Sequence, residues 1–126
     1  MALDYWNSYH SDLELRKLAE DWATQPNTDW TAADDRLLDW MHSNPDRALA
    51  AICAIAQISD DPQPLGLLAA GPLENLICIQ GERVLEPIRI LADEHNSFRD
   101  LVAGVWQHSM PKVLYQKVRA IGVGRL

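Results

Sequence analysis

The chain has 126 residues, 48% of them hydrophobic, and a formal net charge of −7. This composition predicts one folded domain over residues 1–126, and it excludes both a disordered chain and one that crosses a bilayer, which needs a run of about 20 apolar residues. Residues 1–63 contain twelve acidic and four basic residues, against six and seven in residues 64–126, and this acidic first half excludes nucleic acid as the main ligand because phosphates would be repelled.

Apolar residues recur at helical spacing throughout the chain, and strand and hairpin signals are nearly absent. The first expected helix begins at about residue 3 or residue 12 and ends at residue 22. The later ones cover about 31–43, 45–59, 65–70, 73–80, 82–93, 97–106 and 111–121. The short connections between them predict antiparallel neighbours.

Three of these boundaries carry clear capping signals. Thr31 is followed three residues later by Asp34, which marks the start of a helix. Asn44 and Pro45 mark the start of the next one, as a cap and a first-turn proline. Gly81 is expected to end the helix 73–80.

The middle of the chain predicts a tight joint between two helices. Gly71 would end the first helix in a positive-φ conformation, and Pro72 would begin the second, where its missing N–H costs nothing. Glu74 would then lie in the first turn and interact with the positive end of the helix dipole.

These elements predict an all-α fold, as a compact bundle or a small array of about seven short antiparallel helices. In the helix that starts near residue 97, Phe98, Val105 and Trp106 are among the residues expected to point inward. Residues 122–126 are expected to form a frayed tail.

Residues 68–76, which read Leu-Ala-Ala-Gly-Pro-Leu-Glu-Asn-Leu, resemble the core motif of a family of small bacterial proteins known only as a domain of unknown function. Residues 44–48, 81–82 and 98–106 resemble other segments of that family, so the resemblance covers about residues 35–106. Asn75 stands where the family usually has an acidic residue. The resemblance implies an all-helical bacterial protein, and it brings no established activity or catalytic residue.

No arrangement of side chains in the sequence predicts a metal, cofactor or nucleophile site. The nearest metal-like cluster is residues 93–95, Asp-Glu-His, whose neighbouring side chains would point in different directions on a helix. Cys53 and Cys78 lie in apolar helical patterns, which is typical of buried free thiols. Glu74 is the one carboxylate beside the expected joint, where it would either cap its helix or line a cleft.

Aromatic and acidic residues gather in the first 40 residues. Trp and Tyr are favoured anchors at protein interfaces, and carboxylates around them would steer a basic partner. The same tryptophans also suit a helical core. The predicted partner-binding residues are Trp30, Asp34, Asp35, Asp39 and Trp40.

The leading functional hypothesis is a non-catalytic bacterial protein that binds a protein with a basic surface, for example an immunity protein that neutralises a toxin. One alternative is a small-ligand binder or enzyme with a cleft near Gly71, Pro72 and Glu74. Another is a homo-oligomeric scaffold, in which the basic last helix of one chain meets the acidic front of another. No membrane partner is expected, and the N-terminus lacks the features of a signal peptide, so the predicted location is the cytoplasm.

Overall fold

The computed structural model describes residues 4–24, 31–59, 62–107 and 109–124, and within these ranges it contains helices and no strand. The all-α prediction is confirmed. The elements are η1 (Ser8–Ser11), α1 (Leu13–Thr24), α2 (Ala32–Ser43), α3 (Pro45–Ile58), α4 (Pro62–Leu68), η2 (Ala69–Leu73), α5 (Glu74–Gln80), η3 (Gly81–Val84), α6 (Leu85–Glu94), α7 (Asn96–Ala103) and α8 (Lys112–Gly122). No described helix has the length and apolar character needed to span a membrane.

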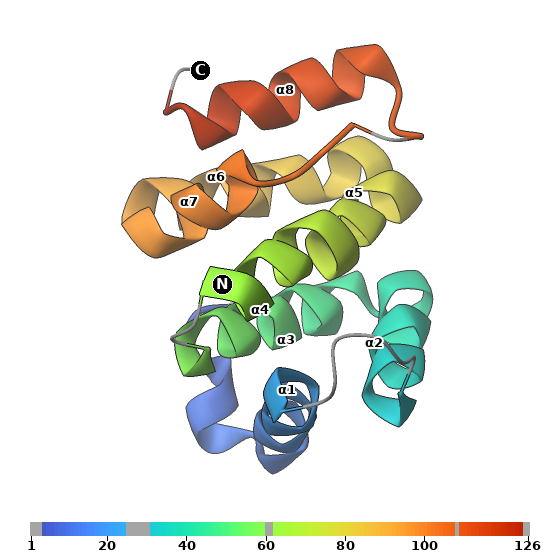
Figure 1. Cartoon of the computed structure of the whole chain (residues 1–126), viewed down its shortest axis with the longest axis vertical. Helices are drawn as coiled ribbons and strands as arrows, with labels where there is room; N and C mark the ends of the chain where they lie inside the picture. Colours follow the sequence, from blue (N-terminus) through green and yellow to red (C-terminus); the bar gives the residue numbers. More distant parts are fainter. Residues whose placement is uncertain (1–3, 25–30, 60–61, 108, 125–126) are drawn as a thin grey trace.

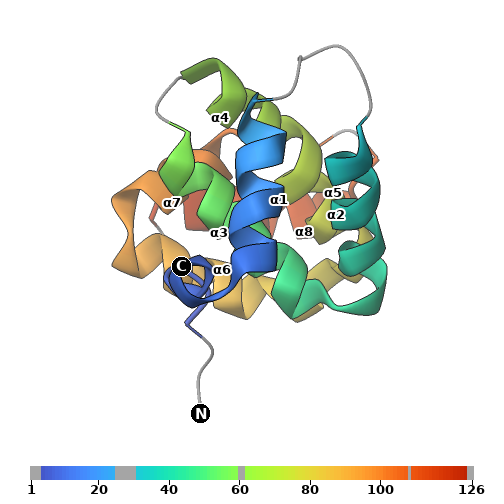
Figure 2. The same ribbon diagram turned by 90° about the horizontal axis from the view of Figure 1, so that it is seen from below.

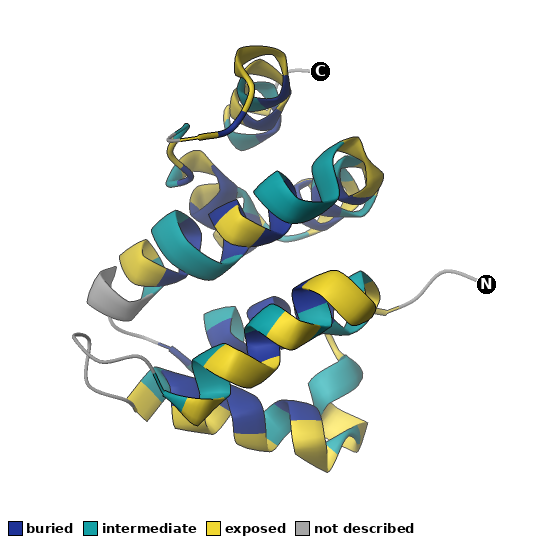
Figure 3. Cartoon of the chain, turned by 90° about the vertical axis from the view of Figure 1, so that its right-hand side faces the viewer, coloured by how far each residue is buried: buried dark blue, intermediate teal, exposed yellow. Residues whose placement is uncertain are grey.

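The helices stack along the longest axis of the molecule, with α1 at one end and α8 at the other (Figure 1). Seen from the α1 end, α1 lies across α3, and α2 lies beside them (Figure 2). Buried residues lie mainly where the layers face each other, and exposed residues lie mainly on the outer sides (Figure 3). The two ends of the stack are therefore formed by segments far apart in the sequence.

Helix α3 is the centre of the core. Every residue from Ala48 to Ile55 is buried, because α3 contacts α1 and α2 as well as α4, α5 and α7. A helix that is apolar on all sides is expected in such a position. Cys53 lies within this segment as a fully buried free thiol, whereas Cys78 is half-buried.

The capping signals in the sequence are confirmed. Thr31 and Asp34 form a reciprocal capping box at the start of α2, and the Asn44 side chain accepts the Arg47 amide at the start of α3. Gly81 ends α5 with a φ of 65°. The start of α1 uses the carboxylate of Asp12, which accepts the backbone N–H groups of residues 14 and 15.

The predicted joint at Gly71 is wrong, because the helix does not stop there. Residues 62–80 continue through α4, η2 and α5, and η2 is a π-helical turn that contains Pro72. Gly71 does not have a positive φ, and the Glu74 amide donates to the Ala69 carbonyl five residues earlier. A proline inside an α-helix lacks an N–H and its ring clashes with the preceding turn, and the wider π turn accommodates both defects without ending the helix.

Two expectations for the C-terminal third are also wrong. Helix α7 ends at Ala103, so Trp106 lies beyond it and is 63% exposed rather than inward. Gly122 is the last residue of α8, and a Cβ built on it would lie 2.9 Å from the Ala103 Cα, so the chain packs closely against α7 where a frayed tail was expected. Residues 125 and 126 of that tail lie outside the described part of the chain.

Candidate functional site

One end of the molecule carries most of the exposed carboxylates that the structure describes. We call this surface the acidic end; it comprises residues 4–24 and 31–47, in the lower part of Figure 1. Its exposed acidic residues are Asp4, Glu14, Glu20, Asp21, Asp35, Asp39 and Asp46. Four cationic side chains share the surface, and two of them are already paired: Lys17 Nζ lies 3.8 Å from an Asp21 oxygen, and Arg47 has the contacts described next.

Arg47 on α3 is held by groups from two other helices. Its Nη1 donates to Asp12 Oδ2 at 3.0 Å, its Nη2 donates to Asp12 Oδ1 at 3.2 Å, and Nη2 also donates to Glu14. On α2, the Trp40 ring lies against the guanidinium, with 4.7 Å between Cζ and the ring centroid. The charge of Arg47 is therefore neutralised inside the protein, in a bidentate pair and a cation–π contact.

A hollow of about 530 Å³ opens beside this pair, between the N-terminal segment, α1 and the first turns of α3. Leu15 and Ala50 contribute apolar surface to it. The ionisable groups among its lining residues are Asp4, Tyr5, Asp12, Asp46 and Arg47. The hollow is thus lined by three carboxylates and one cation that is already paired, and it is suited to a cationic group.

The pKa shifts of the lining groups favour a negative charge in the hollow at neutral pH. Hydrogen bonds from Arg47 lower the pKa of Asp12, and hydrogen bonds from Asn7 lower the pKa of Asp4. Tyr5 donates its hydroxyl proton to Asp46 at 2.8 Å, and burial together with this bond raises the pKa of Tyr5 to about 12. At neutral pH, Asp4 and Asp12 are therefore ionised and Tyr5 is neutral.

The structure separates the predicted partner-binding residues into different roles. Asp34 is used internally, because it closes the capping box with Thr31 and accepts the Trp22 indole N–H at 3.0 Å. Asp35 and Asp39 are exposed, and their spacing of four residues places them on the same face of α2. Of the two tryptophans predicted to bind a partner, Trp40 packs on Arg47, and Trp30 lies outside the described residues.

The other tryptophans of the N-terminal part hold the fold together. Trp22 is buried in the core, and Trp6 stacks on His95 with 4.1 Å between ring centroids. Trp6 also meets the edge of Phe98 at 6.2 Å, and Gln57 donates to its backbone carbonyl. The N-terminal segment is thereby attached to α3, to α7 and to His95 between α6 and α7.

Glu74, which the sequence predicted either to cap a helix or to line a cleft at the joint, is 5% exposed and lies inside the continuous helical run of residues 62–80. It does not line the hollow at the acidic end, nor a smaller, mainly apolar hollow of about 210 Å³ between α4 and α7. Burial raises the pKa of the nearby Cys78, and the charge of Glu74 adds to that effect.

The residues of the metal-like cluster make other contacts. Asp93 accepts from Arg89 at 3.2 Å and from Arg99 at 2.6 Å, and His95 lies against Trp6. Across the described ranges, the structure brings together no group of three or more His, Cys, Asp or Glu side chains suited to holding a metal ion.

Comparison with known proteins assigns a family. Residues 18–125 match the model of a family described as a family of unknown function (DUF6869). The chain belongs to this family. No curated protein and no solved structure gives a significant match to it.

The family match is longer than the segment of about 35–106 that carries the sequence motifs, but it contains only four of the eleven residues that line the hollow. Trp40, Asp46 and Arg47 lie within the match, whereas Tyr5 and Asp12 precede it. The hollow is therefore built from both parts of the chain. Sequence reasoning missed it because Asp12 and Arg47 are 35 residues apart and no local spacing connects them.

Proposed function

We propose that the chain is a non-catalytic interaction protein that binds a protein partner with a basic surface through its acidic end. The hollow beside Arg47 is the observation that carries this proposal. Its carboxylates Asp4, Asp12 and Asp46 outnumber the single lining cation, which already has two carboxylate partners. A Lys or Arg side chain of a partner would find unbalanced negative charge there.

Other exposed residues of the acidic end support the same partner chemistry. Asp35 and Asp39 extend the negative charge along α2, and such a surface accelerates encounter with a basic protein. Leu13 is 81% exposed between Asp12 and Glu14, and it offers an apolar contact inside the charged region. Apolar contacts surrounded by charged groups are a common arrangement at protein interfaces.

One concrete version is an immunity protein of the bacterial cytoplasm that neutralises a toxin with a basic surface, for example a nuclease. The small size and the net charge of −7 suit that role. A toxin-like reading frame next to the gene would support this version, and it would also supply the purified partner for binding measurements.

A pair of charge reversals tests the location of the interface. In Asp35→Lys/Asp39→Lys, two exposed acids of the acidic end become cations, while Asp34 is left intact because it caps α2 and bonds Trp22. The control Glu94→Lys/Asp100→Lys makes the same change in net charge at exposed positions on α6 and α7. Circular dichroism and urea unfolding establish that both variants fold.

The readout is the affinity for the native partner, recovered from the source organism, and for a lysine-rich peptide at low and high salt. We expect the acidic-end variant to bind about tenfold or more weakly than the control, a loss of at least ~1.4 kcal/mol. Equal binding by the two variants would contradict an interface at the acidic end, because the net charge is the same in both.

A further inference from the structure

Helix α8 presents a basic surface at the end of the molecule opposite to the acidic end. Lys112, Gln116, Arg119 and Val123 are exposed, and their spacing places them along one side of the helix; we call this side the basic stripe. The opposite side packs on α6 and α7 through Leu114, Val118 and Ile121. No acidic residue occurs between residues 109 and 124.

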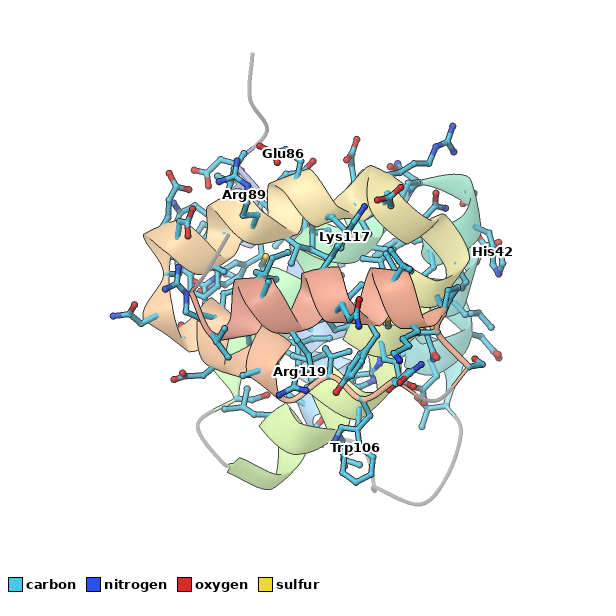
Figure 4. All side chains as sticks on the ribbon, turned by 90° about the horizontal axis from the view of Figure 1, so that it is seen from above. His42, Glu86, Arg89, Trp106, Lys117 and Arg119 are labelled. Atoms are coloured by element: carbon cyan, nitrogen blue, oxygen red, sulfur yellow. The ribbon has the colours of Figure 1, made fainter. Side chains whose placement is uncertain are left out.

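The cations of the basic stripe have no ion-pair partner among the described residues. Lys117, on the other side of α8, pairs with Glu82, whereas the structure gives no such contact to Lys112 or Arg119. Seen from above, Lys117 and Arg119 extend on opposite sides of α8, and Arg119 extends on the side where Trp106 lies (Figure 4). The two positive charges of the stripe therefore face solvent.

Two large apolar side chains are exposed in this part of the chain: Val123 belongs to the basic stripe, and Trp106 lies in the segment between α7 and α8. Trp106 and Val123 are each 63% exposed, whereas the other three tryptophans that the structure describes, Trp6, Trp22 and Trp40, are buried or half-buried. Trp and Arg carry much of the binding energy at many interfaces, and Arg119 extends on the side of α8 where Trp106 lies (Figure 4). The stripe therefore has the composition of a docking surface for an acidic partner.

The acidic end of the same chain has the complementary composition. It combines exposed carboxylates with the exposed Leu13, as the opposite end combines the cations of the stripe with the exposed Val123 and Trp106. The two surfaces lie at opposite ends of the longest axis, so they cannot meet within one molecule (Figure 1). They can meet between two molecules.

We propose that the basic stripe of one copy docks on the acidic end of a second copy, in a head-to-tail arrangement. This inference rests on the proposed function, because it uses the acidic end as the surface that accepts cations, and it names the chain itself as one basic partner. A nucleic acid is a poorer occupant, since the two cations of the stripe can neutralise only a few phosphates, whereas the acidic end of a second copy also offers the exposed Leu13 to apolar contact. A head-to-tail contact leaves both outer ends open, so assembly continues beyond a dimer unless the geometry closes a ring.

The sharpest test uses two variants, each of which loses one of the two complementary surfaces. Lys112→Glu/Arg119→Glu removes the basic stripe and keeps the acidic end, and Asp35→Lys/Asp39→Lys does the reverse. Measured by analytical ultracentrifugation at low salt, the wild-type protein should form species larger than a monomer and return to a monomer at high salt, where the contacts are screened. Each variant alone should be at least tenfold weaker in self-association.

The mixture of the two variants should form a 1:1 complex that does not grow further, because each contributes one intact surface. Trp106→Ala should weaken wild-type self-association without any change in charge. A wild-type protein that stays monomeric at low salt and high concentration, or two variants that do not combine, would overturn the inference. In that case, binding of a lysine-rich peptide by the Lys112→Glu/Arg119→Glu variant would leave the proposed function standing, and its absence would contradict both.

Discussion

Single side chains at the acidic end connect segments that are distant in the sequence. Arg47 on α3 holds Asp12 and Glu14 from the start of α1 and lies against Trp40 of α2. Tyr5 adds the N-terminal segment through its bond to Asp46. These contacts fix the shape of the hollow. They also pair Arg47 with Asp12 and Glu14, so its positive charge does not balance the other carboxylates of the hollow.

The Asp12–Arg47 pair predicts a pH-dependent contribution to stability. Because hydrogen bonds from Arg47 lower the pKa of Asp12, folding favours the ionised carboxylate. The contribution is complete above the ordinary value of 3.8 and is lost as the pH falls through the lowered value of the folded state. We expect Asp12→Asn, which can still cap α1, to lower the free energy of unfolding by about 1 kcal/mol at neutral pH.

Urea unfolding over a pH series measures this prediction. The difference between wild type and Asp12→Asn should shrink toward zero at pH values well below 3.8. A difference that is the same at acidic and neutral pH would show that the loss comes from packing and not from the charge of Asp12.

We expect replacement of Asp34 to lower the free energy of unfolding more than replacement of the exposed Asp39 on the same helix. Replacing Asp34 with Ala removes the capping box of α2 and the acceptor of the buried Trp22 indole N–H, so we expect a loss of about 2 kcal/mol in the free energy of unfolding. The control Asp39→Ala should change it by less than about 0.5 kcal/mol. Similar losses in the two variants would argue against the internal role of Asp34.

The helix of residues 62–80 shows how local signals can fit two structures. Gly71 and Pro72 are typical of a helix that stops and another that starts, and they are equally compatible with a π turn inside one helix. Packing of α4 and α5 on α3 favours the continuous form. The capping residues Thr31, Asn44 and Gly81 were predictable because their partners lie within a few residues.

Two glycine substitutions distinguish the two structures of this segment. Gly71 lacks a positive φ and has no atom near the position of a Cβ, so Gly71→Ala should stabilise the helix by up to about 1 kcal/mol. Gly81 has a φ of 65°, and Gly81→Ala should destabilise by about 1 kcal/mol. Thermal or urea unfolding decides, and a destabilising Gly71→Ala would indicate that the helix ends at Gly71.

Side chains at element ends were harder to predict. The apolar spacing that begins at Phe98 continues past the end of α7, so periodicity placed Trp106 inside, whereas the chain has already left the helix there. The sequence shows that aromatic residues cluster near the N-terminus. It does not show which of them pack in the core and which lie on the surface, because that depends on distant partners such as His95 for Trp6.

For the whole molecule, the uneven charge of the sequence becomes a separation in space. The acidic residues that the structure describes in the first half gather at the α1–α2 end, and Lys112 and Arg119 of α8 lie at the other end of the long axis (Figure 1). The sequence predicted the imbalance between the two halves. The stacking order, set by which apolar faces pack together, determines that the two charges lie at opposite ends.

The central claim is that the acidic end receives a cationic surface. The most direct measurement is a titration of ¹⁵N-labelled protein with a lysine-rich peptide at low salt, followed by amide chemical shifts. We predict shifts concentrated in residues 4–15 and 35–47, around the hollow and the exposed face of α2, which disappear at high salt. Shifts spread evenly over the molecule, or centred on α6 to α8, would contradict the claim.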